Sequence, residues 1–116
     1  MKNKEFLAKY GSKEHIDKII DSGDKESIEM ISKSPTTHVD HLDKLINHLD
    51  TWIRYGVAKN PAATKEQLDK LIKDNDDVRS GVVQNPNATK EHLEKLSTDS
   101  VPYTKILALE KLSKRM

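Results

Sequence analysis

Three histidines recur at a regular interval and are the first candidates for chemistry in this sequence. His15, His41 and His92 each precede an apolar i, i+3 pattern, and Gln67 takes the same place in a further copy. Histidine is a common metal ligand and general base. Metal ligands, however, must meet within about 2 Å of one ion, whereas equivalent side chains on neighbouring helices lie roughly 10 Å apart. The spacing therefore favours a polar flank beside the core over a metal or catalytic site.

Two arginines also share one position. Arg54 and Arg79 occupy the same place in two successive copies of one pattern, with Asp50 near the first and Asp76 and Asp77 near the second. A guanidinium group pairs with a carboxylate or a phosphate through two parallel hydrogen bonds. The first interpretation is an Asp–Arg ladder between repeats, and the second is a contact with an anionic group of a partner.

An aromatic pair stands where the next copy is polar. The counterparts of Trp52 and Tyr55, one copy later, are Asp77 and Ser80. Helical residues three apart share a face, and exposed aromatic side chains are typical binding anchors. These positions predict a partner-binding surface.

Two interpretations of the aromatic pair remain open. In one, both rings pack on a degenerate first repeat, where Ile28 and Met30 leave room. In the other, they form the centre of a contact surface with a polar rim. The candidate residues of that surface are Trp52, Tyr55, Arg54, Lys59 and Arg79.

All of these residues belong to a repeat with a period of about 25–26 residues, within the range typical of helical-repeat proteins. Residues 57–72 and 82–97 are nearly the same, and prolines recur at Pro35, Pro61 and Pro86. Apolar residues at i, i+3 and i+4 after each proline predict an amphipathic helix, and a shorter apolar segment precedes each proline. The helix stripes are Ile16-Ile19-Ile20, Leu42-Leu45-Ile46, Leu68-Leu71-Ile72 and Leu93-Leu96. The unit is therefore a short helix, a proline turn and a second helix.

Local signals define the helix starts. Thr64 and Gln67 have the spacing of a capping box, whereas His38 stands where a capping hydroxyl is expected. We expect the neighbouring Thr37 to cap that helix instead.

The turns and close contacts have signals of their own. Asn60 and Asn85 precede the prolines and suit turn or left-handed conformations. Gly56 and Gly81 cost about 1 kcal/mol each inside a helix, so their matched positions predict close approach of neighbouring helices.

Composition limits the class of protein. The chain has 116 residues, a net charge of +1, 34% charged residues and no cysteine. One domain over residues 1–116 is expected, with residues 100–116 as a C-terminal capping helix and Phe6 and Leu7 covering the other end. Disulfides and cysteine-ligated metals are excluded. The sequence has no signal peptide or long apolar run, which predicts a cytoplasmic protein without a membrane span.

Residues 52–74 and 76–99 resemble leucine-rich-variant repeats, which pair Val-Arg and Asn-Pro with downstream leucines. Residues 27–48 form a degenerate third unit. The resemblance, which extends to HEAT and armadillo repeats, implies an all-α fold: a right-handed α-solenoid of short helix pairs. One family context carries a cysteine-ligated iron–sulfur cluster, which this cysteine-free chain lacks the ligands to hold.

The function expected from these patterns is a non-enzymatic protein–protein interaction module without cofactor. Its partner is a protein, and the module itself is a monomer or weak homodimer. The alternative is a nucleic-acid-binding helical-repeat protein, because some HEAT-like relatives, including a DNA glycosylase family, cradle a duplex. Lysines that alternate with acidic residues, as in KEQLDKLIKDNDD, argue against that alternative.

Overall fold

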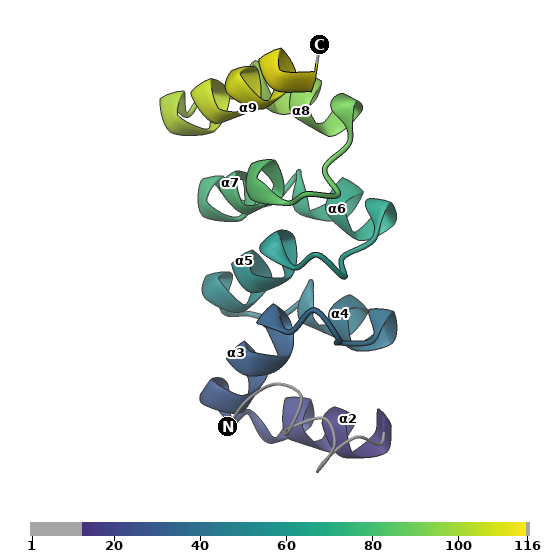
Figure 1. The fold of residues 1–116 in the computed structure, drawn as a ribbon. Coiled ribbons are helices and arrows are strands. Elements are labelled where there is room, and N and C mark those ends of the chain that lie inside the picture. Colours follow the sequence, from purple (N-terminus) through teal and green to yellow (C-terminus); the bar gives the residue numbers. More distant parts are fainter. Residues whose placement is uncertain (1–12, 116) are drawn as a thin grey trace.

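The computed structural model describes residues 13–115, and these residues form eight α-helices and no strand (Figure 1). The fold is therefore all-α. The helices are α2 (Lys13–Ser22), α3 (Lys25–Lys33), α4 (Val39–Leu45), α5 (Thr51–Lys59), α6 (Lys65–Leu71), α7 (Asp76–Gln84), α8 (Lys90–Leu96) and α9 (Pro102–Arg115).

The helices lie in two columns. Helices α3, α5, α7 and α9 follow one another along one side of the molecule, and α2, α4, α6 and α8 follow one another along the other side (Figure 1). Consecutive members of the first column are in contact, α3 with α5, α5 with α7 and α7 with α9. Each helix pair therefore packs on the pair before it, and equivalent residues recur at every level.

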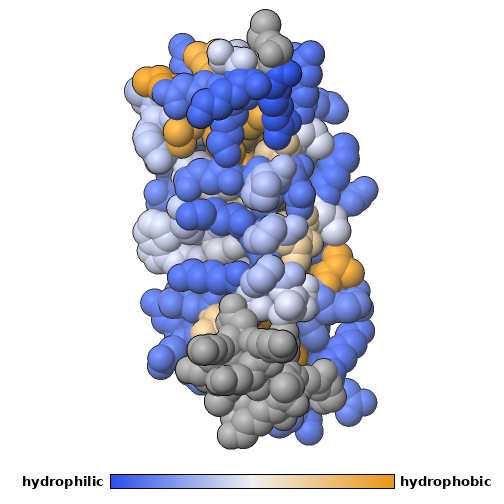
Figure 2. Space-filling model, in the orientation of Figure 1, coloured by the Kyte–Doolittle hydropathy of each residue, from blue (hydrophilic) through white to orange (hydrophobic). Residues whose placement is uncertain are grey.

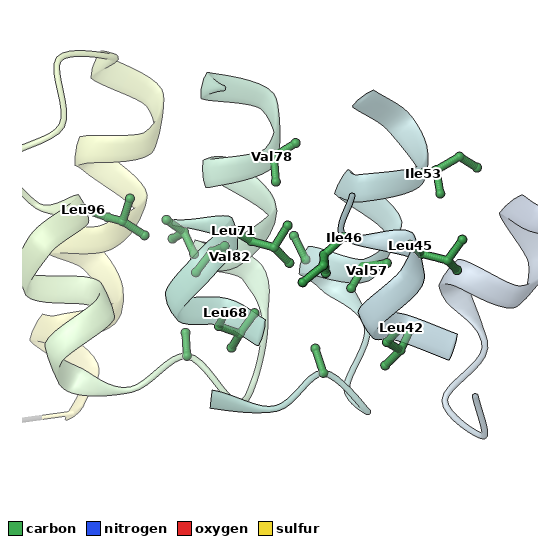
Figure 3. Close-up of a cluster of buried hydrophobic side chains, with 14 of the residues drawn as sticks. Leu42, Leu45, Ile46, Ile53, Val57, Leu68, Leu71, Val78, Val82 and Leu96 are labelled. Carbon is green, nitrogen blue, oxygen red and sulfur yellow. The ribbon is translucent and has the colours of Figure 1, made fainter. Parts of the chain in front are cut away.

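The core is one continuous cluster between the two columns. Figure 3 shows the same kinds of side chain repeated from level to level along it. Burial of each such side chain stabilises the fold by about 1.5–3 kcal/mol. Its fully buried large members are Ile28, Leu42, Leu45, Ile53, Val57, Leu68, Leu71, Val78, Val82, Val83 and Leu93.

The start of α6 confirms the predicted capping box, in which Thr64 accepts from the amide of Gln67 and Gln67 accepts from the amide of Thr64. The prediction for α4 is wrong. His38 caps that helix itself, because its Nδ1 accepts from the amide of Asp40 at 3.1 Å. Thr37 is buried and donates its hydroxyl to the carbonyl of Ile31 at 2.6 Å, so it is committed to the preceding helix.

The close approach predicted at the two glycines is confirmed. A Cβ atom on Gly56 would lie 2.5 Å from Oγ of Ser32 in α3, and one on Gly81 would lie 2.9 Å from Cβ of Ala58 in α5. No room for a side chain exists at either contact.

The turn expected at the asparagines is confirmed, because the amides of Ala63 and Ala88 donate to the carbonyls of Asn60 and Asn85, but the left-handed alternative is wrong. Asn60 and Asn85 have extended backbones, with φ of −70° and −76°, and no left-handed conformation. Their side chains are buried and hydrogen-bonded to the preceding repeat. Asparagine is needed for its amide, which donates and accepts at once, and not for its tolerance of unusual backbone angles.

The last described helix departs from the pattern. Helix α9 has 14 residues, against 9 in α5 and α7, and begins at Pro102, two residues after the start expected from the sequence. Leu107 takes the place that Gly56 and Gly81 have in the shorter helices. Near its end, Arg115 donates to the carbonyl of Ala88 at 2.7 Å. Phe6 and Leu7 lie outside the described residues.

Candidate functional site

Trp52 and Tyr55 lie together on the surface of α5. Their rings meet edge to face, with centroids 5.5 Å apart and planes at 82°. Trp52 is 53% exposed, although it is one of the largest apolar side chains of the molecule. An aromatic ring that is held by a neighbour but still half exposed is a suitable anchor for a partner.

The aromatic pair lines a groove between α3 and α5. The groove has a volume of about 590 Å³, within the range of ligand-binding clefts. One wall comes from α3 and the other from α5, and Gly56 lies where the two helices meet. The lining residues are Glu29, Lys33, Trp52, Tyr55, Gly56, Lys59 and Asn60.

The groove carries more positive than negative charge. Lys33 and Lys59 are exposed, and Glu29 is half-buried. The ammonium group of Lys59 lies 5.4 Å from the ring centroid of Tyr55, a cation–π geometry. Neither lysine belongs to the ion pairs found among residues 13–115. The groove therefore combines an apolar ring with two lysines that carry no carboxylate partner from the described chain.

The two aromatic residues differ in how far they pack. Tyr55 is half-buried, faces Gly81 in α7, and its hydroxyl lies 3.5 Å from Nε2 of Gln84. Ile28 is buried in the core and Met30 packs against it, yet Trp52 stays half exposed. Tyr55 thus supports the stack and the groove, whereas Trp52 is available at the surface.

Arg54 and Arg79 each form a two-point ion pair with an aspartate in the loop that follows the next helix of the other column. Arg54 donates Nε and Nη2 to Asp74 at 2.8 and 3.2 Å, and Arg79 does the same to Asp99 at 2.7 and 3.2 Å. The Asp–Arg ladder exists, but its acids are not Asp50, Asp76 or Asp77, which the sequence suggested.

Each guanidinium group also donates to a backbone carbonyl. Nη1 of Arg54 donates to the carbonyl of His48 at 2.6 Å, and Nη1 of Arg79 donates to the carbonyl of Asp74 at 2.8 Å. The hydrogen bond from Arg79 lowers the pKa of Asp99, and the same contact raises the pKa of the arginine. Both arginines therefore fix the loops that follow α4, α6 and α8.

The histidine ladder is a set of hydrogen bonds between repeats. Nε2 of His92 lies 2.6 Å from Oδ1 of Asp69, and Nδ1 accepts from the amide of Thr89 at 3.0 Å. Gln67 makes the equivalent contact, because its Nε2 donates to Asp43 at 2.8 Å. These polar groups flank the core, as the spacing predicted. Within residues 13–115 no three metal-ligating side chains converge.

One feature of this region escaped the sequence interpretation. Three residues separate the C-cap Ile46 from the N-cap Asp50, whereas two separate Ile72 from Asn75. The extra residue is Leu49, which is 97% exposed. In the sequence, this insertion is visible only as a difference in period: the repeat before Pro61 is one residue longer than the repeat after it. The α3 wall of the groove, Glu29 and Lys33, was also missed.

Comparisons with family models, with curated proteins and with solved structures found no match to this chain. Of the helices described, none combines the length and the apolar character that crossing a membrane requires.

Proposed function

We propose that this chain is a right-handed α-solenoid of the leucine-rich-variant type that acts as a non-enzymatic protein-binding module. Its partner binds in the groove between α3 and α5. The observation that carries the proposal is Trp52, half exposed at this groove, where the next repeat has the polar residue Asp77.

The scaffold part of the proposal rests on the repetition of structure. The Asn-Pro pairs, the glycines and the Arg–Asp pairs recur at the same place in successive helix pairs, and each contacts the pair beside it. Residues with such structural roles are poor candidates for function, since the fold itself requires them. Trp52, Tyr55 and Lys59 of the groove are replaced by other residue types in the next repeat, which supports the groove as the functional surface.

The chemistry of the groove describes the partner. Trp52 offers an apolar face, and Lys33 and Lys59 offer two positive charges against the single Glu29. A peptide segment that carries one apolar side chain beside carboxylates complements this arrangement. Arg54 and Arg79 support the surface by holding the adjacent loops, and their guanidinium groups are already paired.

Nucleic-acid binding is the weaker function for this surface. Lys13, Lys44 and Lys65 pair with Asp40, Asp17 and Asp69 at 2.9 to 3.2 Å. Polyanion binding needs many free positive charges that release counterions, and these lysines are locally neutralised. We therefore expect no binding when duplex or single-stranded DNA is titrated at low salt.

The single tryptophan of the chain makes the proposal directly testable. The emission of Trp52 is expected near the position of a solvated indole and accessible to acrylamide. The protein would be applied to an immobilised array of peptides that each carry an apolar residue beside either acidic or basic residues. Each peptide that binds would then be titrated in solution while the emission of Trp52 is followed. Blue-shifted, quencher-protected emission on binding to acidic peptides supports the groove as the site.

Matched variants separate binding from folding. Trp52→Ala and Lys59→Glu are expected to weaken binding of the selected peptide at least tenfold, as truncation of an anchor does. The affinities of the variants are measured by the fluorescence anisotropy of a labelled peptide, because Trp52→Ala removes the only tryptophan. Leu49→Ala removes a comparably exposed apolar side chain outside the groove and should leave the affinity unchanged. Equal losses in all three variants, or stronger binding of basic peptides or DNA, would contradict the proposal.

A further inference from the structure

Helix α9 presents an apolar stripe on its outer side. Tyr103, Ile106 and Leu109 are 60%, 54% and 48% exposed. In Figure 2, orange atoms gather at the top of the molecule, where α9 lies, and stand among deep-blue side chains. Three large apolar side chains at i, i+3 and i+6 on one helix face form a continuous patch rather than scattered exposure.

The stripe occupies the positions that bind the next helix inside the stack. Counted from the first residue of each helix, Ile106 and Leu109 correspond to Tyr55 and Ala58 of α5. Tyr55 and Ala58 are the side chains that contact Gly81 of α7. The outer face of α9 therefore corresponds to the face by which α5 contacts the next helix of its column.

This face is also almost free of charge. At about 100° per residue, Pro102 and Ser113 lie on the same side as the stripe, opposite the buried Thr104 and Ala108. Glu110 is the one charged residue among them. The other four charged residues of α9, Lys105, Lys111, Lys114 and Arg115, lie outside the strip that these residues form.

We propose that this face binds the same face of a second copy of the chain, with the two α9 helices antiparallel. A two-fold axis at Ile106 pairs the stripe with itself: Ile106 meets Ile106, and Tyr103 meets Leu109 of the other copy. The same arrangement brings Glu110 to the N-terminus of the second α9, where the helix dipole favours a carboxylate. A symmetric interface of this kind needs only one self-complementary patch. It uses a surface separate from the α3–α5 groove.

The expected dimer is weak. Stable interfaces bury about 800 Å² per partner, and three side chains with their neighbours supply roughly half of that area. We expect a dissociation constant on the order of 10–100 μM, which makes association concentration-dependent.

Sedimentation velocity over a dilution series tests the association. The unmodified chain should shift from monomer toward dimer as its concentration rises to several hundred micromolar, about tenfold above the expected constant. Ile106→Glu places two carboxylates on the axis and should weaken dimerisation at least tenfold. Leu49→Glu makes the same kind of change at a 97% exposed position outside the stripe and should leave it unchanged. Circular dichroism of both variants verifies that the outward-facing substitutions leave the fold intact.

Cross-linking tests the geometry. The chain has no cysteine, so Ile106→Cys introduces a single thiol at the proposed axis. Mild oxidation should give a disulfide-linked dimer much faster than oxidation of Leu49→Cys. A monomer at every concentration would overturn the proposal. Species larger than a dimer in sedimentation velocity, or equal cross-linking at both positions, would overturn it as well, because they indicate head-to-tail stacking or random collision.

Discussion

Asn85 donates a 2.8 Å hydrogen bond to the backbone carbonyl of Asn60, the residue at its own position one repeat earlier. Its Nδ2 also donates to Ala58, and Asn60 makes the same two contacts with Ser32 and Ser34. Each asparagine further accepts from a backbone amide two residues later. The Asn-Pro pair that marks the repeat in the sequence is therefore a polar connection between neighbouring helix pairs.

Asn85→Ala should lower the free energy of unfolding by about 3 kcal/mol, because it leaves buried carbonyl and amide groups without partners. The matched control is Asn87→Ala. Asn87 also donates to the preceding repeat, but it is exposed, and Ala62 stands at its position one repeat earlier. Asn87→Ala should lower the free energy of unfolding by no more than about 1 kcal/mol. Urea denaturation measures the free energy of unfolding of both variants. Equal losses would show that the buried hydrogen bonds of Asn85 stabilise the protein no more than the exposed ones of Asn87.

The Arg79–Asp99 pair predicts a dependence of stability on pH. The hydrogen bond from Arg79 holds the pKa of Asp99 below its ordinary value of 3.8. A carboxylate whose pKa is lowered by folding stabilises the native state above the unfolded pKa and loses that effect as pH falls. At neutral pH the free energy of unfolding of the wild type should exceed that of Asp99→Asn by about 2 kcal/mol.

The difference between these two proteins should shrink below about pH 4, where the acid becomes protonated in the unfolded chain. Thermal unfolding at a series of pH values measures it. A difference that stays constant down to about pH 2 would mean that the asparagine acts through packing and not through lost charge.

The repeated features were predictable from sequence because each repeat is evidence for the others. The helix stripes, the capping box at Thr64 and the tight contacts at Gly56 and Gly81 all follow from local chemistry read in register. The partners of Arg54 and Arg79 did not follow, because Asp74 and Asp99 are distant in sequence and reach the arginines only through the loop after the second helix.

The candidate site was predictable only in part, for a related reason. The aromatic residues of α5 were visible as breaks in the repeat, but the opposite wall comes from α3, where the repeat is degenerate and no register fixes Glu29 or Lys33. Leu49 was hidden by the same irregularity, since a one-residue insertion changes the period without leaving a motif.

Gly81→Ala tests the helix contact that holds Tyr55 in the groove. Alanine favours a helix by about 1 kcal/mol over glycine, yet here its Cβ would lie 2.9 Å from Cβ of Ala58 and 3.1 Å from Cδ1 of Tyr55. Overpacking of this kind costs about 1–3 kcal/mol, so the variant should be less stable than wild type. Ala58→Gly relieves the closer contact but costs about 1 kcal/mol of helix propensity. The double variant should therefore lose less stability than the sum of the two single losses, and additive losses would place the strain elsewhere.

Thr104 provides a prediction in the stabilising direction. It occupies the third position of α9, which is Ile53 in α5 and Val78 in α7, and it is fully buried. Within the described residues its hydroxyl oxygen has no hydrogen-bond partner. Thr104→Val keeps the shape of the side chain and removes the unsatisfied group, so stability should rise by about 1 kcal/mol and the melting temperature by roughly 4 °C. Thr104→Ser keeps the hydroxyl and removes the methyl group, and it should be less stable than wild type. Calorimetry measures the melting temperatures of the three proteins, which should fall in the order Val, Thr, Ser. A Val variant that melts below the wild type would show that the hydroxyl has a hydrogen-bond partner in solution.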